Sequence, residues 1–275
     1  MSAREEEKPN ERPGKRQKVG LYTLHYWDGI PGRGEYIRLV FEYTGTPYDE
    51  VKDNSTLMAR ITNPEIVGIP PNLWPPALEL ANGKWLSQTG VIINYLSPKL
   101  GLAGYAKDDT DLDEEEKIFL GAKNAQLVLT VLDMAVELHG VHHPVSVNLY
   151  YEDQKAEALR SAEQFRASRL PKFFQYFQTV LETNPANKGG KGPFLLSSLT
   201  TAADLALFHN MTGVLHAFPR RVKSIQESGK YELVFKLYER VQNEPKIAEY
   251  MESKRRQDFG MFGIFRHYPE LDNEE

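Results

Sequence analysis

The chain has 275 residues, with 33 Lys and Arg against 38 Asp and Glu, and it contains no cysteine. A net charge of −5 leaves no surplus of cations for phosphates, so nucleic-acid binding is not expected to be its main role. The lack of cysteine excludes disulfide scaffolds, CxxC redox chemistry and cysteine nucleophiles, and it favours a cytoplasmic location. The sequence shows no signal-peptide pattern and no uninterrupted apolar run of 18 residues, so we expect no membrane segment.

The first third of the chain predicts a small mixed α/β domain. Residues 1–18 are mostly polar and charged and are predicted to form a disordered tail, because they cannot bury enough apolar surface to become ordered. The domain is expected over residues 19–102. Its predicted elements are a buried strand at 21–27, a helix at 35–44, a strand at 47–51, a proline-rich loop at 54–75, a hairpin turning at 82–83 and a helix at 91–96.

In the following residues the apolar side chains recur about every 3.6 residues, the period of a helix. This spacing predicts an all-helical second domain over residues 108–256. Thr201 with Asp204 resembles a capping box, and Pro171 is expected to kink a long helix. Residues 257–275 have no period but hold four aromatic residues, so we expect this extension to pack on the body of the protein. The predicted helices cover residues 110–140 and 152–182, a stretch that begins at Thr201, and residues 231–242 and 245–255.

Three blocks of sequence resemble glutathione S-transferases in the expected order. The first block, LHYWDGIPGRGEYIRLVFEYTGTPYDEV, is similar to the first strand, helix and second strand of the mu and sigma-like classes. The block NLWPPALELANGKWLSQTGVIINYL resembles the family's proline–strand–strand–helix segment, and FLLSSLTTAADLALFHNM resembles its capped helix. The motifs HGVHHP, LYYEDQK and FRHYPELD are similar to a bacterial and fungal subgroup. The resemblance implies a thioredoxin-like N-terminal domain, an all-α C-terminal domain, a homodimer and glutathione as co-substrate.

Tyr26 is the candidate catalytic residue. Glutathione carries its own thiol, so a chain without cysteine can use thiolate chemistry if it stabilises the thiolate. The resemblance puts Tyr26 where the family has a tyrosine donor; serine is the family's other option, but no Ser or Thr lies between Tyr26 and Phe41. The stretch after Tyr26 is one residue longer than in the mu and sigma patterns. A core aromatic is the alternative interpretation of Tyr26, and Tyr22 is the alternative donor.

The resemblance also implies residues that would hold the rest of glutathione. Pro76 matches the family's cis-proline, and the backbone of Pro75 would pair with the cysteinyl part through its carbonyl alone, because proline lacks an N–H. Gln88 and Thr89, after Ser87, match the helix start that takes the γ-glutamyl carboxylate. The alternatives are a proline-rich surface turn and an ordinary helix cap.

Asp133 and three histidines complete the candidate residues. Asp133 resembles the aspartate that sigma-class transferases extend toward the neighbouring subunit's glutathione, and a solvated helix carboxylate is the alternative. His139, His142 and His143 have a spacing that can bring nitrogens to one helix face. Because Gly140 and Pro144 indicate that the helix ends there, we interpret them as dipole-stabilising histidines, with His139 and His143 as candidates for the electrophile pocket and no metal expected.

The predicted function is therefore transfer of the glutathione thiolate to a hydrophobic small molecule. A glutathione-dependent isomerase or peroxidase would use the same residues. The alternative from another class is a non-catalytic protein of the same fold that binds ligands or regulates, which the inserted residue after Tyr26 and the missing N–H of Pro75 both favour. Neither a nucleic acid nor a membrane is expected as a partner.

Overall fold

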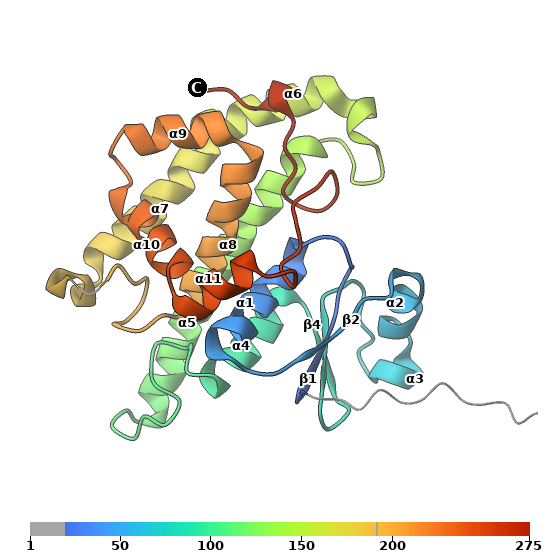
Figure 1. Ribbon diagram of the computed structural model, residues 1–275, viewed down its shortest axis with the longest axis vertical. Coiled ribbons are helices and arrows are strands. Elements are labelled where there is room, and N and C mark those ends of the chain that lie inside the picture. The colour runs from blue at the N-terminus through green and yellow to red at the C-terminus, as the bar shows by residue number, and fades with distance from the viewer. Residues whose placement is uncertain (1–19, 191) are drawn as a thin grey trace, which may run out of the picture.

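The computed structural model describes residues 20–190 and 192–275, so the tail predicted at 1–18 lies outside the described residues. Figure 1 shows a smaller N-terminal part built on a sheet, which lies beside a larger part whose described elements are helices. The predicted fold class, a small α/β domain followed by a helical domain, is confirmed.

The sheet has four strands in the order β2-β1-β3-β4. β1 is parallel to β2 and antiparallel to β3, with Leu24 opposite Glu50 on one side and Leu78 on the other. Residues 23–25 of this central strand are buried, so the strand leads the next residue, Tyr26, into the interior. The strands are β1 Tyr22–His25, β2 Asp49–Val51, β3 Ala77–Leu80 and β4 Trp85–Ser87.

Four helices accompany the sheet, and two of them correct the sequence prediction. Residues 54–75 were expected to be a loop. This prediction is wrong, because the segment contains the helices α2 and α3. The side chains of Asp53 and Asn63 cap these two helices at their first turns. Both helices are too short for a helical period to stand out among the prolines. The helices are α1 Glu35–Thr44, α2 Asn54–Ile61, α3 Pro64–Val67 and α4 Thr89–Lys99.

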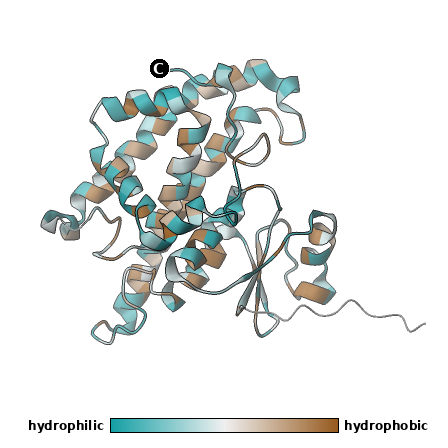
Figure 2. Cartoon of the chain, viewed as in Figure 1, coloured by the Kyte–Doolittle hydropathy of each residue, from teal (hydrophilic) through white to brown (hydrophobic). Residues whose placement is uncertain are grey.

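The larger part contains seven α-helices among the described residues. The helix expected over 152–182 is divided by a π-helical turn at Phe165–Arg169, because Pro171 has no N–H and its ring displaces the carbonyl four residues earlier. α9 was not predicted, since it buries only Val222 and Ile225 and is otherwise polar (Figure 2). The helices are α5 Glu114–His142, α6 Lys155–Gln164, α7 Leu170–Thr183, α8 Ala202–Ala217, α9 Pro219–Glu227, α10 Glu232–Gln242 and α11 Pro245–Glu252.

α8 is the central helix of the molecule. The predicted capping box is present, because Thr201 and Asp204 exchange side-chain to backbone hydrogen bonds. α8 packs against α5 and α10 and also against α1 of the sheet part. His209 lies 3.0 Å from the carbonyl oxygen of Gly32, and the Tyr36 hydroxyl donates to Asn210. These two polar contacts fix the turn between β1 and α1 against the helical part.

The C-terminal stretch packs along the helices. Phe265 and Leu271 are buried, and the ring of Tyr268 stacks on Tyr151 with 3.8 Å between centroids. The Asp272 carboxylate accepts the backbone N–H groups at the start of α9. Phe262, which was expected to pack with the other aromatic residues, is instead 75% exposed, because it lies in an irregular segment next to Gly263.

α5 is the helix that bears on the expectation that no segment crosses a membrane. Among the described residues it is the one helix long and apolar enough to cross a membrane. Polar residues such as Asp133 divide its apolar stretch, so a search for an uninterrupted run missed it. The helix packs on α4, α6 and α8, and 39% of its most apolar window is buried. A core helix of a soluble protein meets the same criteria.

Candidate functional site

The turn between β1 and α1 holds Tyr26 in a fixed position. The Tyr26 side chain is 5% exposed, and the backbone N–H of Arg33 donates to its hydroxyl oxygen over 2.7 Å. The Tyr26 ring packs against the backbone of two glycines of the turn, Gly32 and Gly34. A Cβ on Gly34 would lie 2.6 Å from a ring carbon, and a Cβ on Gly32 would overlap the hydroxyl. Glycine is therefore required at both positions because the tyrosine ring takes the space.

The hydroxyl of Tyr26 is protonated at neutral pH. Burial raises the pKa of Tyr26 above its ordinary value, and the Arg33 N–H and the positive charge of Arg38 counteract only part of this effect. The Arg38 guanidinium lies 5.6 Å from the ring centroid and is itself paired with Glu35 and Glu50. A protonated hydroxyl that accepts one hydrogen bond still has a hydrogen to donate. The geometry is thus compatible with both interpretations of Tyr26, a core aromatic and a donor to a thiolate.

Tyr22, the alternative donor, is placed differently. Its ring stacks on Phe41 with 5.2 Å between centroids, on the hydrophobic side of α1. It lies at the other end of β1 from the turn that holds Tyr26.

A second group of residues lies at the start of α4. The Pro75–Pro76 bond is cis, as the sequence indicated, and both prolines are buried. The Ser87 hydroxyl lies 3.2 Å from the carbonyl oxygens of Trp74 and Pro76, so the end of β4 is tied to this proline segment. Gln88, the N-cap of α4, has a φ of 72° and is the one non-glycine residue of the described chain with a positive φ. Such strain is typical of binding sites.

Two buried polar atoms in this region have no hydrogen-bond partner among the described residues. They are the hydroxyl oxygen of Thr89, in the first turn of α4, and the amide nitrogen of Asn72, in the segment that leads to the cis-proline. The Gln88 side chain makes no capping bond, so the backbone N–H groups at this helix start are also available. Asn72 was missed from the sequence, because burial of its amide becomes visible only in the folded chain.

Asp133 is exposed on α5, one turn beyond Leu129. A Cβ on Gly90 would lie 2.9 Å from the Leu129 side chain, so this part of α5 is adjacent to the α4 start. Leu129 and Val136 are themselves more than half exposed, at 53% and 54%. Asp133 therefore belongs to a partly apolar face of α5 that extends away from the α4 start.

The three histidines come together at the end of α5. Helix α5 ends at His142 with His143 as its C-cap, and one ring nitrogen from each of His139, His142 and His143 lies within 4.8 Å of the other two. Burial lowers the pKa of His139 to about 4 and that of His142 to about 3, so these rings are neutral at neutral pH. Both shifts argue against the interpretation of His139 and His142 as charges that stabilise the helix dipole.

The histidines, the β1–α1 turn and the C-terminal stretch lie near one another. The charge of Arg33 acts on both Tyr26 and His139. A Cβ on Gly263 would lie 3.7 Å from the Ile30 side chain, so the C-terminal stretch contacts the turn. The charges of Arg33 and Arg266 both act on His139, so these two arginines lie near the histidines.

Comparisons with known proteins agree with this architecture. Residues 139–254 match the family model described as glutathione S-transferase, C-terminal domain. A protein named glutathione S-transferase from Plasmodium falciparum is 24% identical over 238 residues, which are 85% of this chain and 96% of that protein. S-crystallin 4 of Enteroctopus dofleini is 23% identical over 86% of this chain and 99% of its own length.

Solved structures show the same fold. The structure described as monomeric Na-GST-3, a glutathione S-transferase from the hookworm Necator americanus, has a TM-score of 0.59 and 21% identity over 86% of this chain and 99% of that one. The structure named NaGST1 has a TM-score of 0.60 and 22% identity over 88% and 98% of the two chains.

Proposed function

We propose that this chain, which belongs to the glutathione S-transferase family, binds glutathione at the start of α4 and joins it to a hydrophobic electrophile, by forming a bond between the thiolate sulfur and the electrophile with loss of the thiol proton. The observation that carries the binding part is the pair of buried, unpartnered polar atoms on Thr89 and Asn72. An unpaired buried polar atom costs free energy unless a ligand satisfies it, so such atoms mark a place where a polar molecule binds. Glutathione is a peptide-like molecule with two carboxylates and matches these donors.

Each part of the glutathione molecule has a candidate partner. The γ-glutamyl carboxylate would accept from the Thr89 hydroxyl and the free N–H groups at the start of α4, where the helix dipole also favours an anion. The Gln88 side chain is exposed beside this position. The cysteinyl N–H would donate to the carbonyl of Pro75, and Asp133 would pair with the amino group of a glutathione in the neighbouring subunit.

The thiol would then lie toward Tyr26. A free thiol has a pKa near 8.5, so the protein must stabilise the thiolate to react at neutral pH. The Tyr26 hydroxyl can donate its hydrogen to the thiolate while the Arg33 N–H polarises its oxygen. The electrophile would lie on the side of His139 and His143, between the β1–α1 turn and the C-terminal stretch.

A non-catalytic ligand-binding or regulatory protein is the second candidate function. Two observations favour it: the Tyr26 side chain is 5% exposed with its hydroxyl already bonded to Arg33, and Pro75 offers no N–H. Retention on immobilised glutathione, followed by turnover of an activated chloronitroaromatic, separates the two functions. We expect both retention and turnover. Retention without turnover would favour the second function, and no retention would contradict both.

We further propose a cytoplasmic homodimer. The exposed side chains of Leu129 and Val136 on α5 and Val91 on α4 form an apolar surface that a second copy would cover. Substitution Leu129→Lys should shift light scattering from the dimer mass to that of a 31.4 kDa monomer. An unmodified chain that is already monomeric at micromolar concentration would contradict the dimer and the role of Asp133 across subunits.

A further inference from the structure

The histidine cluster at the end of α5 has one nitrogen with no partner. The Nε2 atom of His142 lies 2.9 Å from the carbonyl oxygen of Ile264. A carbonyl can only accept, so Nε2 carries the hydrogen and Nδ1 keeps its lone pair. This Nδ1 atom is buried and has no hydrogen-bond partner in the described part of the chain. A buried lone pair without a partner costs free energy, and a proton donor or a metal ion would remove this cost.

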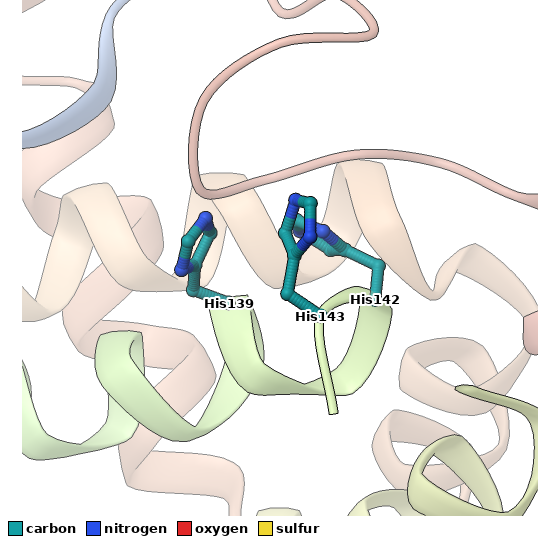
Figure 3. Close-up of side chains that lie close together, drawn as sticks. All are labelled: His139, His142 and His143. Atoms are coloured by element: carbon teal, nitrogen blue, oxygen red, sulfur yellow. The ribbon is translucent and has the colours of Figure 1, made fainter. Parts of the chain in front are cut away.

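The other two histidines surround that nitrogen. The ring centroids of His139 and His143 lie 5.1 and 4.8 Å from that of His142. The Nδ1 atom of His143 lies 3.3 Å from the side-chain amide nitrogen of Gln154, which also donates to the carbonyls of Ser146 and Leu149. Figure 3 shows the three side chains on the same side of the last turn of α5.

The hydrogen bond of His142 to a backbone carbonyl is of the kind found in metal sites. A metal-binding histidine usually donates its second N–H to a backbone carbonyl, which fixes the ring and its tautomer. The Ile264 carbonyl does this for His142.

We propose that His139, His142 and His143 bind one divalent transition-metal ion of the class that prefers imidazole, such as Zn²⁺, Co²⁺ or Ni²⁺. The nitrogens of a tetrahedral site with metal–nitrogen bonds of 2.0–2.1 Å are about 3.4 Å apart, so separations of up to 4.8 Å must close by at most about 1.4 Å. In this proposal, rotation of the His139 side chain supplies most of this movement, because Ile264 holds His142 and Gln154 contacts His143.

The fourth coordination position is open. Within the described residues the cluster contains these three histidines and no carboxylate. Three histidines with one open position are typical of a site that binds water or an exogenous ligand. The positive charge of Arg266, which acts on all three rings, weakens binding of the bare cation but favours an anion in the fourth position.

The proposal is tested by titrating Co²⁺ and Zn²⁺ into the full-length, untagged chain after removal of metals with a chelator. We expect one ion per chain and a visible spectrum of four-coordinate Co²⁺ that Zn²⁺ displaces. The variants His139→Gln and His143→Gln should each weaken binding by at least about 10- to 100-fold, the range found even for residues that only support a ligand.

The control is His216→Gln, which alters another histidine pair, His216 and His267, whose ring centroids are 6.2 Å apart. It should leave Co²⁺ binding unchanged. Melting temperature serves as a second measurement, because an ion that binds only the folded chain raises it for the unmodified chain and the control but not for His139→Gln. Absence of a Co²⁺ spectrum, or equal loss of binding in the control, would overturn the proposal.

Discussion

The β1–α1 turn and the start of α4 are both part of the candidate site, but their polar groups are in opposite states. In the turn, the Tyr26 hydroxyl is buried and already accepts a hydrogen bond from Arg33. At the α4 start, the Thr89 hydroxyl and the Asn72 amide are buried without partners. A ligand can therefore supply the missing hydrogen-bond partners at the α4 start, whereas the Tyr26 hydroxyl in the turn already has a partner within the chain. Under the proposed function, binding of glutathione and reaction of its thiol are therefore two properties that variants can separate.

The largest effect on the free energy of unfolding is expected from a substitution that places a side chain against Tyr26. Gly32→Ala puts a methyl group against the Tyr26 hydroxyl at a φ of 45°, where a side chain is also strained. Overpacking of this kind lowers the free energy of unfolding by about 1–3 kcal/mol, to which the backbone strain adds. Urea unfolding measures the loss. In the double variant with Tyr26→Phe part of it should return, and no recovery would show that the ring does not determine the turn.

The next largest effect is expected on the reaction rate, when the Tyr26 hydroxyl is removed. Tyr26→Phe removes the proposed hydrogen bond to the thiolate, worth about 1.5–3 kcal/mol, together with the hydrogen bond from the Arg33 N–H, and leaves the ring in place. The pKa of the bound thiol should rise by about one to two units, and the rate at neutral pH should fall about 10- to 100-fold. Thiolate absorbance and the pH–rate profile measure both changes, and raising the pH should restore part of the rate.

Tyr22→Phe is the matched control for that variant, because its ring stacks on Phe41. It should change the rate far less. An unchanged pH–rate profile for Tyr26→Phe would mean that Tyr26 is a core aromatic. The thiolate donor would then be a backbone N–H of the turn.

A smaller effect is expected at the α4 start. Thr89→Val keeps the shape of the side chain and removes the unpartnered hydroxyl. Glutathione affinity should fall about 10-fold, the lower end of the range for one hydrogen bond to a charged group, because the N–H groups at the helix start still bind the carboxylate; the melting temperature should stay the same or rise. Thr130→Val on α5, whose hydroxyl lies 3.0 Å from the Gln126 carbonyl, is the control and should leave affinity unchanged. A lower melting temperature with unchanged affinity for Thr89→Val would make Thr89 an ordinary core residue.

The smallest effect is expected from Ser87→Ala. Its hydroxyl shares one hydrogen between the carbonyls of Trp74 and Pro76 at 3.2 Å each, so the cis-proline segment should loosen only slightly. We expect a loss of about 0.5–1 kcal/mol in unfolding free energy and a small decrease in glutathione affinity, both measurable by thermal unfolding and calorimetry. A loss of affinity larger than that of Thr89→Val would place the binding determinant on the proline segment rather than on α4.

The sequence predicted the fold where local signals were strong. The Asn82–Gly83 turn, the stop at Gly45 and the Thr201–Asp204 capping box all act over a few residues, so the pattern alone identifies them. α2, α3 and α9 were missed because each is short and is stabilised by caps or by docking rather than by a long apolar stripe.

The site was less predictable than the fold. The motif placed Gln88 and Thr89 at a helix start, but the positive φ of Gln88 and the missing partners of Thr89 and Asn72 depend on the whole chain. The spacing of His139, His142 and His143 left open whether their rings meet. Burial against the C-terminal stretch, more than 120 residues away in sequence from His142, determines their charge state.

The most direct test of the central claim is a calorimetric titration of glutathione and of S-methylglutathione into the unmodified chain and Thr89→Val. Because recognition at the α4 start does not involve the thiol, we expect both ligands to bind the unmodified chain and both to bind Thr89→Val more weakly by the same factor. Failure of S-methylglutathione to bind, or equal affinities for the two proteins, would contradict glutathione binding through the start of α4.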